Sequence, residues 1–133
     1  MSITIKGGFD IFRNQIVNIV LQKNNIWNFG MIMYNKKKIF NINSNQENKI
    51  ELIKYNTKHA LVINDMIIYE NEKLFIYDIK LDMNNNVNEN INVNENINVN
   101  ENINVNENIY KNIIYNVINY NDFRDFNLTR SLN

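Results

Sequence analysis

The sequence predicts a mainly β protein, a small closed barrel followed by one C-terminal α-helix. The first eighty residues contain short runs of β-branched and aromatic residues about ten residues apart, which is typical of small barrels and sandwiches. Near residue 109 the apolar residues change from a period of two to a helical spacing. A chain of 133 residues has room for one hydrophobic core, so we expect a single domain.

Six apolar runs in residues 1–83 are the candidate strands of the barrel. They cover residues 15–22, 26–34, 38–42, 49–55, 60–69 and 74–81, and the fifth is interrupted by Asn64 and Asp65. Either residues 26–42 form one bent strand or Gly30 marks a kink, and the expected number of strands is five. The sequence has no proline and only three glycines, so we expect Asn, Lys and Asp to form the turns.

Residues 84–108 form an Asn-rich segment with a strict period of two. The unit ENINVN recurs within it, so that Val, Ile and Glu share one face of an extended chain and Asn occupies the other. A stacked β-solenoid is one interpretation. We favour an insertion without fixed structure in a surface loop, because the Asn face buries too little apolar surface to offset the entropy of ordering.

Residues 109–126 are predicted to form an amphipathic helix of the same domain. Its apolar stripe consists of Ile109, Tyr110, Ile113, Ile114, Val117 and Ile118. Ile, Val, Asn and Tyr are poor helix formers, so packing must stabilise this helix. The surface that packs against the stripe is either the barrel itself or another chain.

The composition argues against an enzyme and against a bound metal or cofactor. There is no cysteine, which excludes disulfides and thiolate sites, and His59 is the only histidine, which excludes a multi-histidine metal site. No apolar run approaches the roughly 18 residues of a membrane span. The net charge is zero, although residues 1–60 hold nine Lys or Arg against three Asp or Glu.

Three consecutive lysines between two candidate strands are a candidate nucleic-acid site. Lys36, Lys37 and Lys38 follow an aromatic run that includes Trp27. Barrels that bind single strands combine basic loops with aromatic residues, because phosphates pair with the charges and bases stack on the rings. The alternative is a solvated hairpin turn beside core aromatics.

The order of these elements resembles the smallest subunit of replication protein A. The resemblance is carried by residues 5–12 (IKGGFDIF) as a lead, residues 15–20 (QIVNIV) as the first strand and residues 49–53 (KIELI) as the central strand. The runs at 60–69 and 74–81 resemble the last hairpin, and residues 110–123 resemble the closing helix with its aromatic end.

This resemblance implies a five-stranded OB-fold barrel with a C-terminal helix that holds a heterotrimer together. Members act in the nucleus, in DNA replication, repair and recombination, and the helix packs against the middle and large subunits. The residues that would form this subunit interface are Tyr110, Ile113, Ile114, Val117 and Ile118. Single-stranded DNA would be bound through the complex. The alternative function is a free-standing oligonucleotide-binding module that uses Trp27 and the three lysines.

Overall fold

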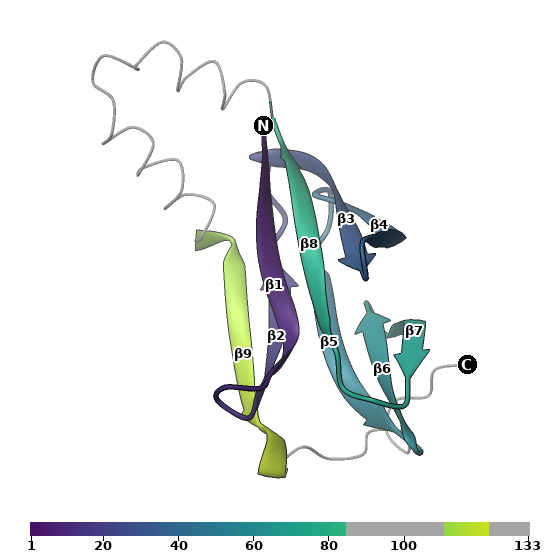
Figure 1. Ribbon diagram of the computed structural model, residues 1–133. Helices are drawn as coiled ribbons and strands as arrows, with labels where there is room; N and C mark the ends of the chain where they lie inside the picture. The colour runs from purple at the N-terminus through teal and green to yellow at the C-terminus, as the bar shows by residue number, and fades with distance from the viewer. Residues whose placement is uncertain (85–110, 123–133) are drawn as a thin grey trace.

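The computed structural model describes residues 1–84 and 111–122, which form a nearly closed barrel of antiparallel strands (Figure 1). This part of the chain contains nine strands and one short 3-10 helix, Tyr120–Asp122. The strands are β1 (Ser2–Asp10), β2 (Gln15–Leu21), β3 (Trp27–Tyr34), β4 (Lys37–Asn43), β5 (Asn48–Tyr55), β6 (Lys58–Ile63), β7 (Met66–Asn71), β8 (Ile76–Met83) and β9 (Ile113–Asn119).

The strands follow the order β4-β3-β8-β1-β2-β5-β6-β7, and β9 pairs with β2. The two ends of this order, β4 and β7, lie against each other. Near this seam, rings from both ends of the order pack together. The ring centroid of Tyr34 lies 4.9 Å from that of Tyr69 and 5.1 Å from that of Phe75. Asn71 also donates a hydrogen bond of 3.3 Å to the Tyr34 hydroxyl. Side chains therefore help to close the barrel where backbone pairing ends.

Polar residues form the turns, as the scarcity of glycine and proline predicts. Within the described residues, six residues other than glycine adopt a positive φ, a conformation that Asn and Asp tolerate better than most side chains. They are Asn14, Asn35, Lys36, Asn56, Asn64 and Asp65. Five of these six are Asn or Asp, so the Asn-rich composition supplies the tight turns that glycine supplies elsewhere.

Strand β2 connects the two halves of the barrel, which are β4-β3-β8-β1 and β5-β6-β7. Strand β9 pairs with every residue of β2 and so occupies one edge, while β1 and β5 share the other edge at opposite ends. The side of β2 that faces the core changes along its length, because Ile16 at the β1 end and Ile19 at the β5 end are both fully buried. Between them Asn18 Oδ1 accepts a 2.8 Å hydrogen bond from the Leu52 backbone N–H, beyond the point where β5 separates from β2.

The predicted C-terminal helix is wrong within the described residues, because Ile113–Asn119 form β9. Since β9 follows β2 through its change of inward face, Ile113 and Ile118 pack on the core although they point to opposite sides of the strand. Ile114 and Val117 remain exposed. Apolar residues on both sides of one strand produce the same spacing as a helical stripe. The rest of the predicted segment, residues 109–110 and 123–126, lies outside the described residues.

The barrel also has more strands than the five expected. The run at residues 60–69 is the hairpin of β6 and β7, residues 26–42 are two separate strands, and the predicted lead at residues 5–12 is mostly β1. Residues 1–84 and 112–122 contain no α-helix, so the arrangement is a nearly closed antiparallel barrel without the predicted helix. The Asn-rich segment from residue 85 lies outside the described residues.

The core holds one buried hydroxyl without a partner. Tyr77 points inward from β8, and its hydroxyl has no hydrogen-bond partner among the described residues. Desolvation, and secondarily the charge of Glu51, raises the pKa of this hydroxyl above its ordinary value. The ring lies against Gly7 of β1, where an added Cβ would come within 2.4 Å of the hydroxyl oxygen. The close packing of Tyr77 therefore requires glycine at position 7.

Candidate functional site

The turn between β1 and β2 presents large apolar side chains to solvent. Ile11 is 71% exposed and Phe12 is 97% exposed. The turn is held by Asp10, whose Oδ1 accepts hydrogen bonds from the backbone N–H groups of Phe12 (3.0 Å) and Arg13 (3.3 Å). Such a local side-chain cap fixes a turn without help from the core. Phe12 is therefore displayed by a fixed turn.

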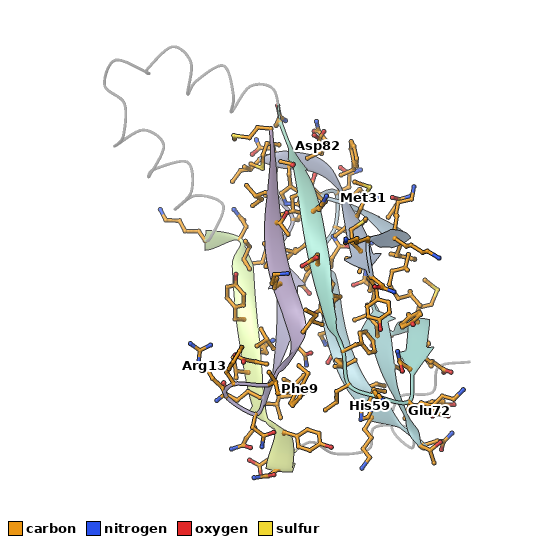
Figure 2. The ribbon with its side chains drawn as sticks, viewed as in Figure 1. Phe9, Arg13, Met31, His59, Glu72 and Asp82 are labelled. Atoms are coloured by element: carbon orange, nitrogen blue, oxygen red, sulfur yellow. The ribbon has the colours of Figure 1, made fainter. Side chains whose placement is uncertain are left out.

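An apolar groove of about 410 Å³ lies beside this turn. Its apolar lining includes Phe9, Ile11, Phe12, Val17 and Ile76, and its charged lining consists of Lys6, Asp10 and Arg13. Figure 2 shows Phe9 and Arg13 close to the turn. A cavity of this size can accept one or two large side chains of another molecule.

The strand register explains why the groove forms here. Val117 of β9 pairs with Val17 of β2, Val17 pairs with Gly8 of β1, and Gly8 pairs with Ile76 of β8. Directly paired residues point to the same side of a sheet, so these four form one row on the outer face. Gly8 has a φ of 97°, and a Cβ there would lie 2.4 Å from the carbonyl oxygen of Phe75. Because Gly8 has no side chain, the row has a depression at this position. Ile76 and Val117, each 52% exposed, lie on either side of it.

The charges around the groove are paired with each other. Arg13 Nη1 lies 2.9 Å from Asp10 Oδ2, and Lys6 Nζ lies 2.9 Å from Asp78 Oδ1. Desolvation raises the pKa of Asp10, but the hydrogen bonds from Arg13 and Phe12 outweigh it and lower the pKa below its usual value. Because these charged groups are paired with each other, the groove offers mainly apolar contact.

The structure divides the predicted subunit-interface residues between the core and the surface. Ile113 is buried, and Ile118 is half-buried against the core. Ile114 and Val117 are exposed but on opposite sides of β9, and Tyr110 lies outside the described residues. Only Val117 belongs to the row beside the groove. These residues therefore do not form one continuous stripe.

The most exposed residues of this surface were missed by the sequence analysis as site residues. Ile11 and Phe12 were assigned to a lead segment, and Ile76 to a strand. The available signal was the pair Ile11 and Phe12 in the short segment between Asp10 and Gln15, since two adjacent large apolar residues are unusual in a turn.

The predicted nucleic-acid site is separated in the structure. Lys36, Lys37 and Lys38 are exposed at the β3–β4 turn, but Trp27 is 2% exposed and lies at the opposite end of β3. At about 3.3 Å per residue the two ends of β3 are roughly 23 Å apart.

The outer face beside the three lysines carries acidic residues as well as basic ones. Met33 pairs with Asp78 and Phe29 pairs with Asp82 of β8. Figure 2 shows Met31 and Asp82 at the upper end of this face. Asp78 therefore lies on the part of this face nearer the lysine turn, whereas Asp82 lies toward the opposite end of β3.

The described residues contain no group of three or more His, Cys, Asp or Glu side chains that could hold a metal ion. His59 Nδ1 lies 2.9 Å from the backbone carbonyl oxygen of Glu72, at the lower right of Figure 2. Burial lowers the pKa of His59, which favours the neutral ring. No helix within residues 1–84 and 111–122 has the length and apolarity to cross a membrane.

Comparisons with family models, curated proteins and solved structures find no match to this chain. A functional assignment therefore depends on the residues and geometry of the barrel itself. The groove and the turn beside it are the part of the described surface where exposed apolar residues gather around a cavity.

Proposed function

We propose that this chain is a non-catalytic subunit of a protein assembly and binds its partner through the groove surface, defined as Ile11, Phe12, Ile76 and Val117. The observation that carries the proposal is the exposure of these four large apolar side chains: Ile11, Phe12 and Ile76 line one groove, and Val117 is paired with Val17, which also lines it. Covering a large apolar side chain contributes roughly 1.5–3 kcal/mol, so a few such contacts can anchor a partner. The paired charges at the rim suit the polar border of such an interface.

The assembly that the sequence resemblance proposes is a nuclear replication protein A-type heterotrimer that acts in DNA replication, repair and recombination. A small antiparallel barrel is compatible with this proposal. The expected helix is a strand over Ile113–Asn119, so a helix bundle formed by these residues no longer supports it. In this proposal the middle and large subunits contact the groove surface, and single-stranded DNA is bound through the complex.

Co-purification tests the groove surface directly. A tagged full-length chain is recovered from the cells that produce it, and the co-purifying proteins are identified by mass spectrometry. Phe12→Ser and Val117→Ser should each reduce partner recovery at least tenfold. Met66→Ser is the matched control, because Met66 is similarly exposed (51%) but lies on β7 outside the groove. Undiminished recovery with both groove variants would contradict the proposal.

The identity of the partners tests the replication protein A-type assembly separately. Two larger subunits that bind single-stranded DNA would support it. Partners without single-stranded-DNA-binding activity would contradict this assembly, while the loss of those partners in Phe12→Ser would still establish the groove as a binding surface.

The alternative of a free-standing oligonucleotide-binding module is favoured by one observation, the exposed turn at Lys36–Lys38. A fluorescence titration of the full chain with a single-stranded oligonucleotide at low and high salt tests it. Micromolar binding that weakens with salt and is lost in Lys37→Glu would support this function, because phosphate contacts release counterions. Absence of binding at low salt would remove it.

A further inference from the structure

A second cavity lies at the end of the barrel that carries the β1–β2 turn. This mouth cavity has a volume of about 360 Å³ and is lined by Phe9, Ile11, Tyr34, Leu74, Phe75 and Ile76. These residues belong to the end of β1, the end of β3, the start of β8 and the loops beside them. Phe9, Ile11 and Ile76 also line the groove, so the mouth cavity and the groove are neighbours with a common wall.

The walls of the mouth cavity are rich in aromatic rings. The ring centroid of Phe75 lies 5.1 Å from that of Tyr34 and 5.4 Å from that of Tyr69. Phe9 is joined to Phe75 by a 3.0 Å hydrogen bond from its backbone N–H to the Phe75 carbonyl oxygen. Aromatic rings gain from edge-on and tilted contacts with one another, so a further aromatic side chain suits this cavity.

The chain leaves the described barrel beside this cavity. Tyr120 begins the 3-10 helix, and its backbone N–H donates a 2.9 Å hydrogen bond to the Asn14 carbonyl oxygen. Its ring centroid lies 5.8 Å from that of Phe9, which lines both the mouth cavity and the groove. The last described residue, Asp122, is therefore held close to both.

The sequence that follows Asp122 contains two phenylalanines at short range. Residues 123–133 read FRDFNLTRSLN and lie outside the described residues. At about 3.3 Å per residue, Phe123 can reach about 10 Å from Tyr120, and Phe126 can reach about 20 Å. Phe123 and Phe126 can themselves be up to about 10 Å apart, which suits two cavities that share a wall.

We propose that residues 123–126 bind to this end of their own barrel and place Phe123 and Phe126 in the two neighbouring cavities, one in the mouth cavity and one in the groove. Both cavities are mainly apolar in their lining. The segment therefore covers Ile11 and Ile76, which are 71% and 52% exposed in the described barrel.

The short connection favours this segment over a separate molecule as the occupant. A binding segment that is attached a few residues away has an effective concentration on the order of millimolar, so two modest apolar contacts are enough to hold it. A separate molecule must in addition lose its translational and rotational freedom when it binds. Only a partner with stronger contacts can then displace the segment.

This binding regulates the groove surface. The segment and the partner both use Ile11 and Ile76, so they compete, and the segment lowers the apparent affinity for the partner. The competition rests on the proposed function of the groove, whereas the binding of the segment to its own barrel does not.

A spin label on the segment tests its position in the full-length chain. The chain has no cysteine, so Asn127→Cys carries a single nitroxide label. In amide NMR spectra the oxidised label should at least halve the intensity of the Leu74 N–H signal relative to the reduced label. The Ser44 N–H signal should change much less, because Ser44 N–H is bonded to Asn28 near the opposite end of β3.

Replacing the two phenylalanines separates specific binding from mere attachment. Adding Phe123→Ser and Phe126→Ser should restore most of the Leu74 signal, whereas Leu132→Ser, the matched control farther along the segment, should not. Ile11→Asp should also restore it from the barrel side, and the exposure of Ile11 makes unfolding an unsuitable explanation. No selective loss at Leu74, or a loss that persists in both the phenylalanine and the Ile11→Asp variants, would overturn the proposal.

Partner recovery tests the competition separately. Phe126→Ser in the full-length chain should raise the recovery of co-purifying partners at least twofold, while Leu132→Ser should leave it unchanged. Unchanged recovery with Phe126→Ser would overturn the regulation. Selective signal loss at Leu74 together with partner recovery that Phe12→Ser does not reduce would contradict the proposed function and leave the binding of the segment established.

Discussion

Strands β8 and β9 bury their side chains by different rules. In β8, the odd-numbered residues Tyr77, Ile79, Leu81 and Met83 are buried, and the even-numbered residues Ile76, Asp78, Lys80 and Asp82 are exposed or half-buried. In β9, Ile113 and Ile118 pack on the core, whereas the residues between them are exposed. In β8 the strict alternation of odd- and even-numbered residues decides which side chains are buried, but in β9 it does not.

The difference follows from the neighbours of each strand. Strand β8 lies between β1 and β3 and belongs to one half of the barrel, so one of its sides faces the core throughout. Strand β9 lies on β2, whose other edge passes from β1 to β5, so the side that faces the core changes near Asn18. A strand that joins two halves of a barrel can thus be apolar on both sides.

The largest effect is expected from breaking the alternation in β8. Ile79→Ala should lower the free energy of unfolding by about 2–5 kcal/mol, because Ile79 is fully buried in the main core. The neighbouring Lys80→Ala should change it by no more than about 0.5 kcal/mol. Urea unfolding followed by the fluorescence of Trp27, the only tryptophan, measures both. Similar losses for the two variants would contradict the assigned faces.

In β9, replacing either of two adjacent isoleucines by alanine should have different effects on the free energy of unfolding. Ile113→Ala should lower the free energy of unfolding by about 2–3 kcal/mol, since Ile113 is buried in the main core. Ile114→Ala should cost less than about 1 kcal/mol, because Ile114 is 40% exposed. The same urea experiment compares them. Equal losses would mean that both side chains are packed, as on a helix between two surfaces, and that β9 is wrongly assigned.

The change of inward face depends on the hydrogen bond from Leu52 N–H to Asn18. Asn18→Ala leaves that buried backbone N–H without its acceptor and should cost about 1–3 kcal/mol. Asn116→Ala is the matched control, because Asn116 is directly opposite Asn18 in β9 but is exposed. A loss no greater than that of the control would show that Asn18 does not stabilise this junction.

Tyr77 provides a further stability test on the inward side of β8. Tyr77→Phe removes a buried hydroxyl that has no partner among the described residues, and should raise the free energy of unfolding by about 1 kcal/mol. Tyr34→Phe should give no gain, because the Tyr34 hydroxyl accepts a hydrogen bond from Asn71. A destabilised Tyr77→Phe variant would indicate that the hydroxyl is hydrogen-bonded.

The smallest effect concerns the turn that leads into β2. The folded pKa of Asp10 is lowered, so its ionised form stabilises the fold above the unfolded pKa, and this contribution is lost as pH falls through the folded pKa. The melting temperature of Asp10→Asn should lie slightly below that of the unmodified chain near about pH 7, and the gap should close by about pH 2. A gap that is constant over this range would show that the charge of Asp10 is not involved.

Local pattern predicts the strands whose side chains alternate or form continuous apolar runs. The runs at residues 15–22, 49–55 and 74–81 match β2, β5 and β8 closely. The use of Asn, Lys and Asp in the turns was predicted as well. The sequence analysis nevertheless took residues 60–69 as one run, whereas Asn64 and Asp65 adopt positive φ values and join β6 to β7. Strand β1 was missed because Gly7 and Gly8 dilute its apolar pattern, and their role depends on Tyr77 and Phe75 of a distant segment.

The candidate site was predictable only in part. The sequence marks Val117 as an apolar residue that needs a partner, but it does not show that Val117 shares a row with Val17, Gly8 and Ile76. The directly paired residues Val17 and Val117 of that row are a hundred positions apart, and strand register is fixed by long-range pairing. For Trp27 the sequence predicted a site residue that the structure does not expose. Its aromatic side chain suits base stacking, but its place in the sheet buries it.

The sequence by itself determined that the chain is mainly β, that it turns on Asn and Asp, and that it lacks the residues of thiolate and multi-histidine sites. These properties depend on local conformational preference and on side-chain chemistry. Only the tertiary structure decided that residues 113–119 are a strand, that Phe12 stands beside a groove and that β9 pairs with the whole length of β2. An apolar side chain carries no information about which surface will cover it until distant strands have paired.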